Sequence, residues 1–235
     1  MSAVPSEDEI KAILAGASAY SPSNKSKLEA YIGAQASGKA AYSFDANRTL
    51  LKLYQFYPPS SASEEDKGKE GSNSALALLL ALLQYPATTD LLALSCLVPE
   101  RIQTQEPCAS ILKCAELLDA CQFAEFWTTY KSLEANPPAA IAAVPLSQHH
   151  AKLQAAICAV LALTYRTAPL SVATVALNVG SGSELSGRKD LPQIESVDAS
   201  NVYFAPTADN TKRNRVFQDV DFNSISSLMT KIVRE

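Results

Sequence analysis

The chain has 235 residues, of which 47% are hydrophobic and 19% are charged, and its formal net charge is −4 at pH 7. This apolar content is enough for one large domain or two modest ones, and it excludes the solvated composition of a disordered chain. The negative net charge argues against a protein whose whole surface binds nucleic acid. Few glycines and abundant alanine and leucine favour helix over sheet.

The cysteines form an odd set of five, at positions 96, 108, 114, 121 and 158. We interpret them as reduced thiols, because three of them lie inside apolar helical patterns. No two have the spacing of zinc ligands, so neither a metal nor another cofactor is expected. The N-terminal segment lacks the apolar run of a signal peptide, and no apolar run is long enough to span a bilayer. A soluble, cytoplasmic protein without membrane contact is the expectation.

Helix signals follow one another from the N-terminus. Ser6 and Glu9 have the spacing of a capping box, which predicts a first short helix. Ser21 and Pro22 are typical of the cap and first position of a second helix. A strongly apolar third helix is predicted over 44–56, because the two prolines that follow it must stop a helix.

A polar segment without period follows, SSASEEDKGKEGSNS over 60–74. Its mixed charge and lack of apolar residues predict a flexible surface loop that is dispensable for the fold. The next eleven residues, 75–85, are apolar on every side, as expected of a helix buried between neighbours. A proline ends that helix, and another short helix is predicted over 91–98.

The stretch around which the rest of the chain should pack runs from Ile111 to Tyr130. Residues at helical spacing predict one buried face: Ile111, Cys114, Ala115, Leu118 and Cys121. The rhythm breaks at Cys121 and Gln122 and restarts, which predicts a helical hairpin. Its second helix carries Phe123, Phe126 and Trp127, which we expect to be buried between the hairpin and the preceding helices. Three consecutive helix pairs therefore make 1–145 a domain of degenerate helical repeats.

Prolines at 137, 138 and 145 mark a boundary. Beyond it we expect a long helix from His149 to Tyr165, a short one from Leu170 to Val179, and a third over 183–196. The best strand pattern in the chain is VYFAP, at 202–206. Helices followed by a strand predict a small winged-helix module over 146–210. A basic linker and a C-terminal helix are predicted for 211–235.

Three blocks of sequence, taken together, are similar to those of a known family. NRTLLKLYQFYPP at 47–59, ILKCAELLDACQFAEFW at 111–127 and DFNSISSLMTK at 221–231 resemble the K subunits of eukaryotic translation initiation factor 3, in the PCI and winged-helix group. The blocks have the order and approximate spacing of that family. The resemblance implies a mainly α fold, with a HEAT-like helical repeat domain, a winged-helix module and a C-terminal helix in PCI-type architecture.

The same resemblance implies a function. It indicates a non-catalytic scaffold subunit of factor 3 that contributes to assembly and to association with the small ribosomal subunit, directly or indirectly. Other factor 3 subunits, subunit L above all, would be its partners, and DNA would not. The alternative is a PCI-type subunit of another assembly, the proteasome lid or the signalosome.

Catalytic patterns in the chain are weak. His149 and His150 precede Cys158 by nine and eight residues, about 13 Å along a helix, which is too far for a thiol and its base. No other histidine exists in the sequence. Gly180-Ser181-Gly182 is too short for a phosphate-binding loop and is typical of a turn. We therefore expect no enzyme.

Charge separates the C-terminal part into two regions. Residues 146–210 carry a net −1, the wrong sign for a module that must neutralise phosphates, whereas 211–235 carries a net +2. Lys212, Arg213 and Arg215 are candidates for a weak RNA contact. Five apolar residues recur at helical spacing and are candidates for docking to a partner: Phe222, Ile225, Leu228, Met229 and Ile232.

Overall fold

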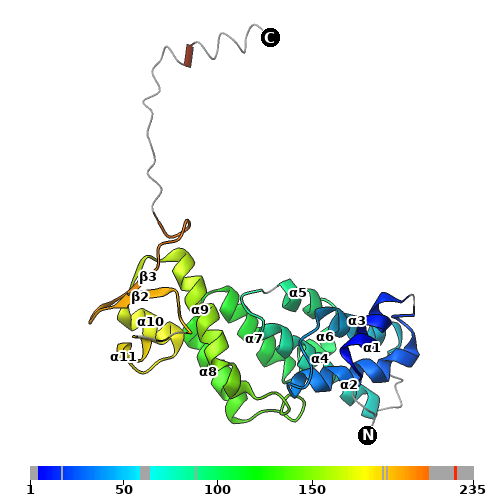
Figure 1. The fold of residues 1–235 in the computed structure, drawn as a ribbon. Helices are drawn as coiled ribbons and strands as arrows, with labels where there is room; N and C mark the ends of the chain where they lie inside the picture. Colours follow the sequence, from blue (N-terminus) through cyan, green and yellow to red (C-terminus); the bar gives the residue numbers. More distant parts are fainter. Residues whose placement is uncertain are drawn as a thin grey trace.

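The computed structural model describes residues 5–16, 18–58, 64–87, 89–186, 188, 190–211 and 225–226. These ranges are mainly helical, as the composition predicts, with one small sheet (Figure 1). The helices before residue 120 form one end of an elongated molecule, and the sheet lies at the other. The buried apolar side chains nevertheless form one continuous cluster that extends from Ile10 to Phe204.

The N-terminal helices begin where the sequence signals predict. They are α1 (Glu7–Ala15), the 3₁₀ turn η1 (Pro22–Asn24), α2 (Lys25–Ala36) and α3 (Phe44–Phe56). The predicted capping box is confirmed, because Glu9 N donates to Ser6 Oγ at 3.2 Å while Ser6 N donates to Glu9 Oε2 at 3.0 Å. Helix α3 ends at Phe56, before the two prolines that cannot continue it.

The centre of this end of the molecule is α4 (Glu64–Leu82). It contacts α2, α3, α5 (Thr89–Ser95) and α7 (Cys108–Asp119), and the short α6 (Glu100–Gln103) packs against α7. Every residue from Ala75 to Leu83 is buried, as the all-round apolar pattern predicts. Helix α4 is therefore surrounded by other helices, and the hairpin that follows is one of its neighbours.

The prediction of a flexible loop over 60–74 is wrong for residues 64–74, which form the first half of α4. Their charges are arranged for a helix: Glu64 pairs with Lys67 and Glu65 with Lys69, three and four residues apart. Glu70 is only 1% exposed and pairs with Arg101 of α6 at 2.7 Å. The segment is thus part of a helix, and Glu70 packs it against α6. The sequence alone does not reveal the burial of Glu70, because nothing in it distinguishes a buried glutamate from a solvent-exposed one.

The predicted hairpin is confirmed as α7 and α8 (Phe123–Ala135). The break also falls where it was expected, since Gln122 N donates to Leu117 O at 2.8 Å and Cys121 has a left-handed backbone with φ of 56°. Cys121 itself is exposed, so its predicted place on the buried face is wrong. Helix α7 ends at Asp119, and the left-handed turn then directs Cys121 away from the face that Ile111 and Cys114 share.

The C-terminal part alternates helices with short strands. In order these are η2 (Leu146–His149), α9 (His150–Thr164), β1 (Thr167–Pro169), α10 (Leu170–Leu177), α11 (Gly182–Leu185), β2 (Ile194–Val197) and β3 (Asn201–Phe204). The strands form one antiparallel sheet in the order β1-β3-β2. Val202 of β3 lies between Ala168 of β1 and Val197 of β2.

The two predicted helices of this part and the strand at 202–206 are found, with small shifts in their ends. The third predicted helix, over 183–196, is wrong except for its first turn, and Ile194–Val197 is a strand. Pro192 cannot continue the helix, and Ile194 and Val197 are three residues apart, so the segment lacks the two-residue alternation that predicts a strand. Gly182 permits α11 to approach α10 closely, because a Cβ there would lie 2.8 Å from Leu170 Cδ2.

The Glu70–Arg101 pair gives the first prediction. Replacing Arg101 with alanine leaves the Glu70 carboxylate buried without its cation, and we expect a loss of about 3 kcal/mol in the free energy of unfolding. Urea unfolding followed by circular dichroism measures it. Lys69→Ala, which breaks an exposed pair on the same helix, is the matched control and should cost less than about 1 kcal/mol. Equal losses in the two variants would contradict the structural role of Glu70.

Candidate functional site

An aromatic cluster joins the hairpin to the C-terminal part. Trp127 on α8 lies edge-on to Phe126, Tyr130 and His150, with ring centroids 5.1 to 5.9 Å apart. Tyr130 is fully buried, and its hydroxyl donates to Leu146 O at 3.0 Å. This contact crosses from α8 to η2, so the end of the helical part and the start of the next part share one set of rings.

The C-terminal end of α10 is completed by side chains from other helices. The Trp127 indole donates to Ala176 O at 2.9 Å, and the Gln154 amide of α9 donates to Leu177 O at 2.8 Å. The last carbonyls of a helix have no partner within it, so these two donors supply what α10 lacks. Gln154 is held in turn by Arg188, whose Nη1 donates to its Oε1 at 3.0 Å.

Trp127, Phe123 and Phe126 are buried, as predicted, but the expected surroundings of Trp127 are wrong in part. The indole points toward α10 and His150, which follow the hairpin in the chain, and not toward the helices that precede it. The helical pattern of α8 indicates which residues are buried. It cannot tell which later segment covers them.

The two histidines lie at the same junction. The pKa of His149 is lowered from its usual value because burial disfavours the charged ring, and Lys152 adds to the effect. His150 lies 3.0 Å from Glu134 Oε2 and so has a carboxylate partner. Burial raises the pKa of the Cys158 thiol to about 11, which keeps it protonated at neutral pH.

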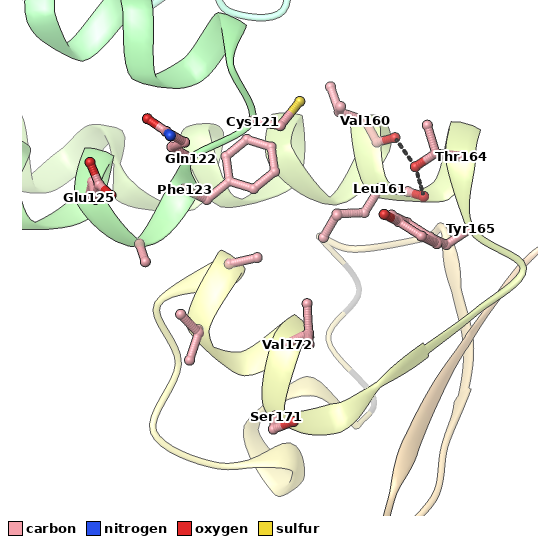
Figure 2. Close-up of a pocket in the computed structure, with 13 residues that line it drawn as sticks. Cys121, Gln122, Phe123, Glu125, Val160, Leu161, Thr164, Tyr165, Ser171 and Val172 are labelled. Atoms are coloured by element: carbon pink, nitrogen blue, oxygen red, sulfur yellow. Dashed lines mark hydrogen bonds between the residues drawn. The ribbon is translucent and has the colours of Figure 1, made fainter.

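A groove of about 540 Å³ opens beside this junction. Three helix segments line it: the start of α8 with the turn before it, the last turns of α9, and the outer face of α10. Figure 2 shows that Phe123, Leu161, Tyr165 and Val172 converge on the space between these helices. Its volume lies within the range of pockets that receive small molecules or anchoring side chains.

The rim of the groove is unusually apolar for a protein surface. Val172 and Val175, both on α10, are each 55% exposed, and Tyr165 at the end of α9 is about half exposed. The charged residue of its lining is Glu125, at the end opposite Tyr165 (Figure 2). A contiguous exposed apolar surface with few charges is typical of a site that binds another polypeptide.

The sequence did not predict this groove. Its residues come from three segments, and only their packing brings them together. The signal that could have pointed to it is α10 itself, LSVATVAL, which is apolar on every side although its helix is covered on one side only.

The predicted docking and RNA-contact residues fall almost entirely outside the described residues. Ile225 is the exception, and its side chain is 50% exposed. The others lie in 212–224 and 227–235, which the structure does not describe: Lys212, Arg213, Arg215, Phe222, Leu228, Met229 and Ile232.

Among the described residues, no group of three or more His, Cys, Asp or Glu side chains could hold a metal ion. No helix in these same ranges is long and apolar enough to cross a membrane.

Comparison with known proteins agrees with the resemblance drawn from the sequence blocks. The chain is 27% identical over 217 residues to eukaryotic translation initiation factor 3 subunit K of Homo sapiens, which covers 92% of each protein. The subunit K proteins of Xenopus laevis and Nematostella vectensis are 28% and 27% identical over 219 and 220 residues. The chain is thus similar to factor 3 subunit K over almost its whole length. No protein-family model matches it.

The junction gives a second prediction. Trp127→Ala should lower the free energy of unfolding by about 3–5 kcal/mol, because it empties a buried aromatic site. Trp127→Phe keeps most of the ring volume but leaves Ala176 O without its donor, so its cost should be about 1–2 kcal/mol. Urea unfolding by circular dichroism measures both. Thr128→Ala on the exposed face of α8 is the control. A neutral Trp127→Phe would contradict the indole's role in completing α10.

The five thiols give a third prediction. All are free, and burial raises the pKa of Cys108 to about 11, of Cys114 to about 12 and of Cys158 to about 11, whereas Cys96 and Cys121 are exposed. A water-soluble thiol reagent at pH 7.5 should label Cys96 and Cys121 rapidly in the folded protein, because the reagent requires an accessible thiolate. All five should react in denaturant, and mass spectrometry identifies the sites. Rapid labelling of Cys114 in the folded state would contradict the packing of the hairpin.

Proposed function

We propose that the chain is a non-catalytic scaffold subunit of eukaryotic translation initiation factor 3, of the subunit K type. The single observation that carries the proposal is the similarity to subunit K proteins over 92% of the chain and 92% of the human protein. A match that covers most of both proteins supports a whole-subunit role more strongly than a shared motif would. Factor 3 subunits, with subunit L first among them, are then its partners.

The proposed architecture is PCI-type, with a HEAT-like helical repeat domain over 1–145 and a winged-helix module over 146–210. The order of elements after residue 145 supports the second assignment: α9, β1, α10, α11, β2, β3 is the helix-strand-helix-helix-strand-strand order of a winged helix. The packing of α4 among α2, α3, α5 and α7 supports a stack of helices for the first.

The mechanism that we propose is the presentation of surfaces. Packed helices hold the groove in the position that a partner needs, and the C-terminal segment would offer a second contact, without any chemical step. Protein contact takes precedence over RNA contact, because 146–210 carries a net −1. The basic residues Lys212, Arg213 and Arg215 would add a secondary contact to ribosomal RNA, and association with the small ribosomal subunit would come mainly through the assembled factor.

Affinity purification from native cell extract, followed by mass spectrometry, tests the proposal. We expect the tagged full chain to retain the other subunits of factor 3 through washes at moderate and high salt. Retention of proteasome-lid or signalosome subunits in their place would contradict the assignment to factor 3, as would capture of no partner above the untagged control.

Two variants divide the roles of the C-terminal segment in the same purification. Deletion of 217–235 should reduce partner recovery at every salt concentration, because apolar contacts are insensitive to salt screening. Reversal of Lys212, Arg213 and Arg215 to glutamate should leave partner recovery nearly unchanged and lower only salt-sensitive RNA retention. The opposite pattern would show that charge, and not the apolar stripe, holds the assembly.

A further inference from the structure

The groove is an apolar surface that is exposed in the structure, where Val172 and Val175 are each 55% exposed. Exposed apolar area is costly in water. The groove therefore favours a state in which something covers it. Of the C-terminal residues that the structure describes, Ile225 is likewise 50% exposed.

We propose that, in the isolated protein, the groove between α8, α9 and α10 is occupied by the chain's own residues 222–232. This segment would lie across the groove as a helix and cover it until a partner takes the segment away. The contact would keep the apolar stripe of the free protein out of water. On assembly, this intrachain contact would be replaced by an apolar contact with the partner.

The place where the segment starts supports this occupant. Asn210 Nδ2 donates to Ala162 O and to Ala205 O, each at 2.8 Å, and Asn210 N donates to Thr207 Oγ1 at 3.1 Å. These bonds hold the chain beside the last turns of α9, and the same turns supply Leu161, Thr164 and Tyr165 to the groove. The continuous part of the described chain thus ends, at Thr211, next to α9, which forms one wall of the groove.

The intervening length is sufficient. Ten residues, 212–221, separate Thr211 from Phe222, and extended chain spans at most about 3.5 Å per residue, or about 35 Å here. A short tether between two binding segments gives an effective concentration on the order of millimolar. At ordinary protein concentrations the chain's own segment therefore has an advantage over the same segment of a second copy.

The pattern of the segment fits a groove of this kind. As a helix, its apolar residues at 222, 225, 229 and 232 would form one stripe, which is how amphipathic helices occupy apolar grooves. The segment from 222 to 232 would be about 15 Å long. A groove of about 540 Å³ has room for a few anchoring side chains, while the helix backbone would rest on the rim formed by α9 and α10.

Charge favours one direction of the helix. With Phe222 toward Tyr165 and the end of the segment toward α8, Lys231 would lie near Glu125, the charged residue of the groove lining, at the end opposite Tyr165.

Cross-linking to the exposed thiol of Cys121, which lines the groove, tests the proposal. In a Cys96→Ser background, Met229→Cys should form an intrachain disulfide with Cys121 under mild oxidation by copper phenanthroline. Its yield should not depend on protein concentration, and non-reducing electrophoresis with peptide mass spectrometry identifies it. Ser227→Cys is the matched control, because a helix directs residue 227 away from the apolar stripe.

A substitution in the groove provides a second test. Val175→Asp should lower the yield of the Met229→Cys cross-link about tenfold or more, because docking would bury a carboxylate among apolar groups. Leu92→Asp, on the exposed face of α5 away from the groove, should leave the yield unchanged. Val172→Lys serves as a second groove variant, and circular dichroism verifies that each variant is folded.

Several outcomes would overturn the proposal. Equal cross-linking of Met229→Cys and Ser227→Cys would show that the segment does not bind the groove through its apolar stripe. Cross-linked dimers that increase with protein concentration would show that a second copy of the chain is the occupant. Absence of any cross-link to Cys121 would also refute it. Because this experiment uses the isolated chain, its failure would leave the proposed assembly with factor 3 intact, and a failed co-purification would leave the cross-link intact.

Discussion

The rest of the structure depends on how the last carbonyls of α10 are satisfied. A helix that ends inside a protein must find donors for these groups or lose stability. Here the donors come from elsewhere in the chain, the Trp127 indole on α8 and the Gln154 amide on α9. The Tyr130 hydroxyl makes a similar bond to Leu146 O, where the C-terminal part begins. These bonds tie α10 and η2 to the hairpin and α9 at the junction across which the apolar core is continuous.

The groove lies on the side of α10 that its packing partners leave uncovered. Val172 and Val175 are exposed there, toward the start of α8. The proposed role as a scaffold subunit needs such a surface, since a non-catalytic subunit acts through what it binds. The aromatic cluster would then hold the groove in place, and the groove and the C-terminal segment would be the two apolar surfaces that bind partners.

Local signals in the sequence predicted much of the fold, whereas features that depend on contacts between distant residues were not predicted. The capping box at Ser6, the all-round burial of 75–83 and the break at Cys121 follow from rules that act over a few residues. The helix over 64–74 was missed because the local charge pairs were interpreted as a solvated loop, and because the burial of Glu70 depends on Arg101, which is distant in the chain. The groove was missed for the same reason, since three separate segments line it. The family resemblance came from whole blocks and carried more functional information than any single residue.

The central claim is that the junction at Trp127 and Tyr130 makes the described chain one cooperative unit. Native-state hydrogen exchange with mass spectrometry, repeated over a series of urea concentrations, tests it most directly. Amides of α4, in the middle of the helical part, and of β3, at the centre of the sheet, should become exchangeable with the same urea midpoint and the same slope. Exchange of β3 at a clearly lower urea concentration than α4 would show that the two ends unfold separately, and it would contradict the claim.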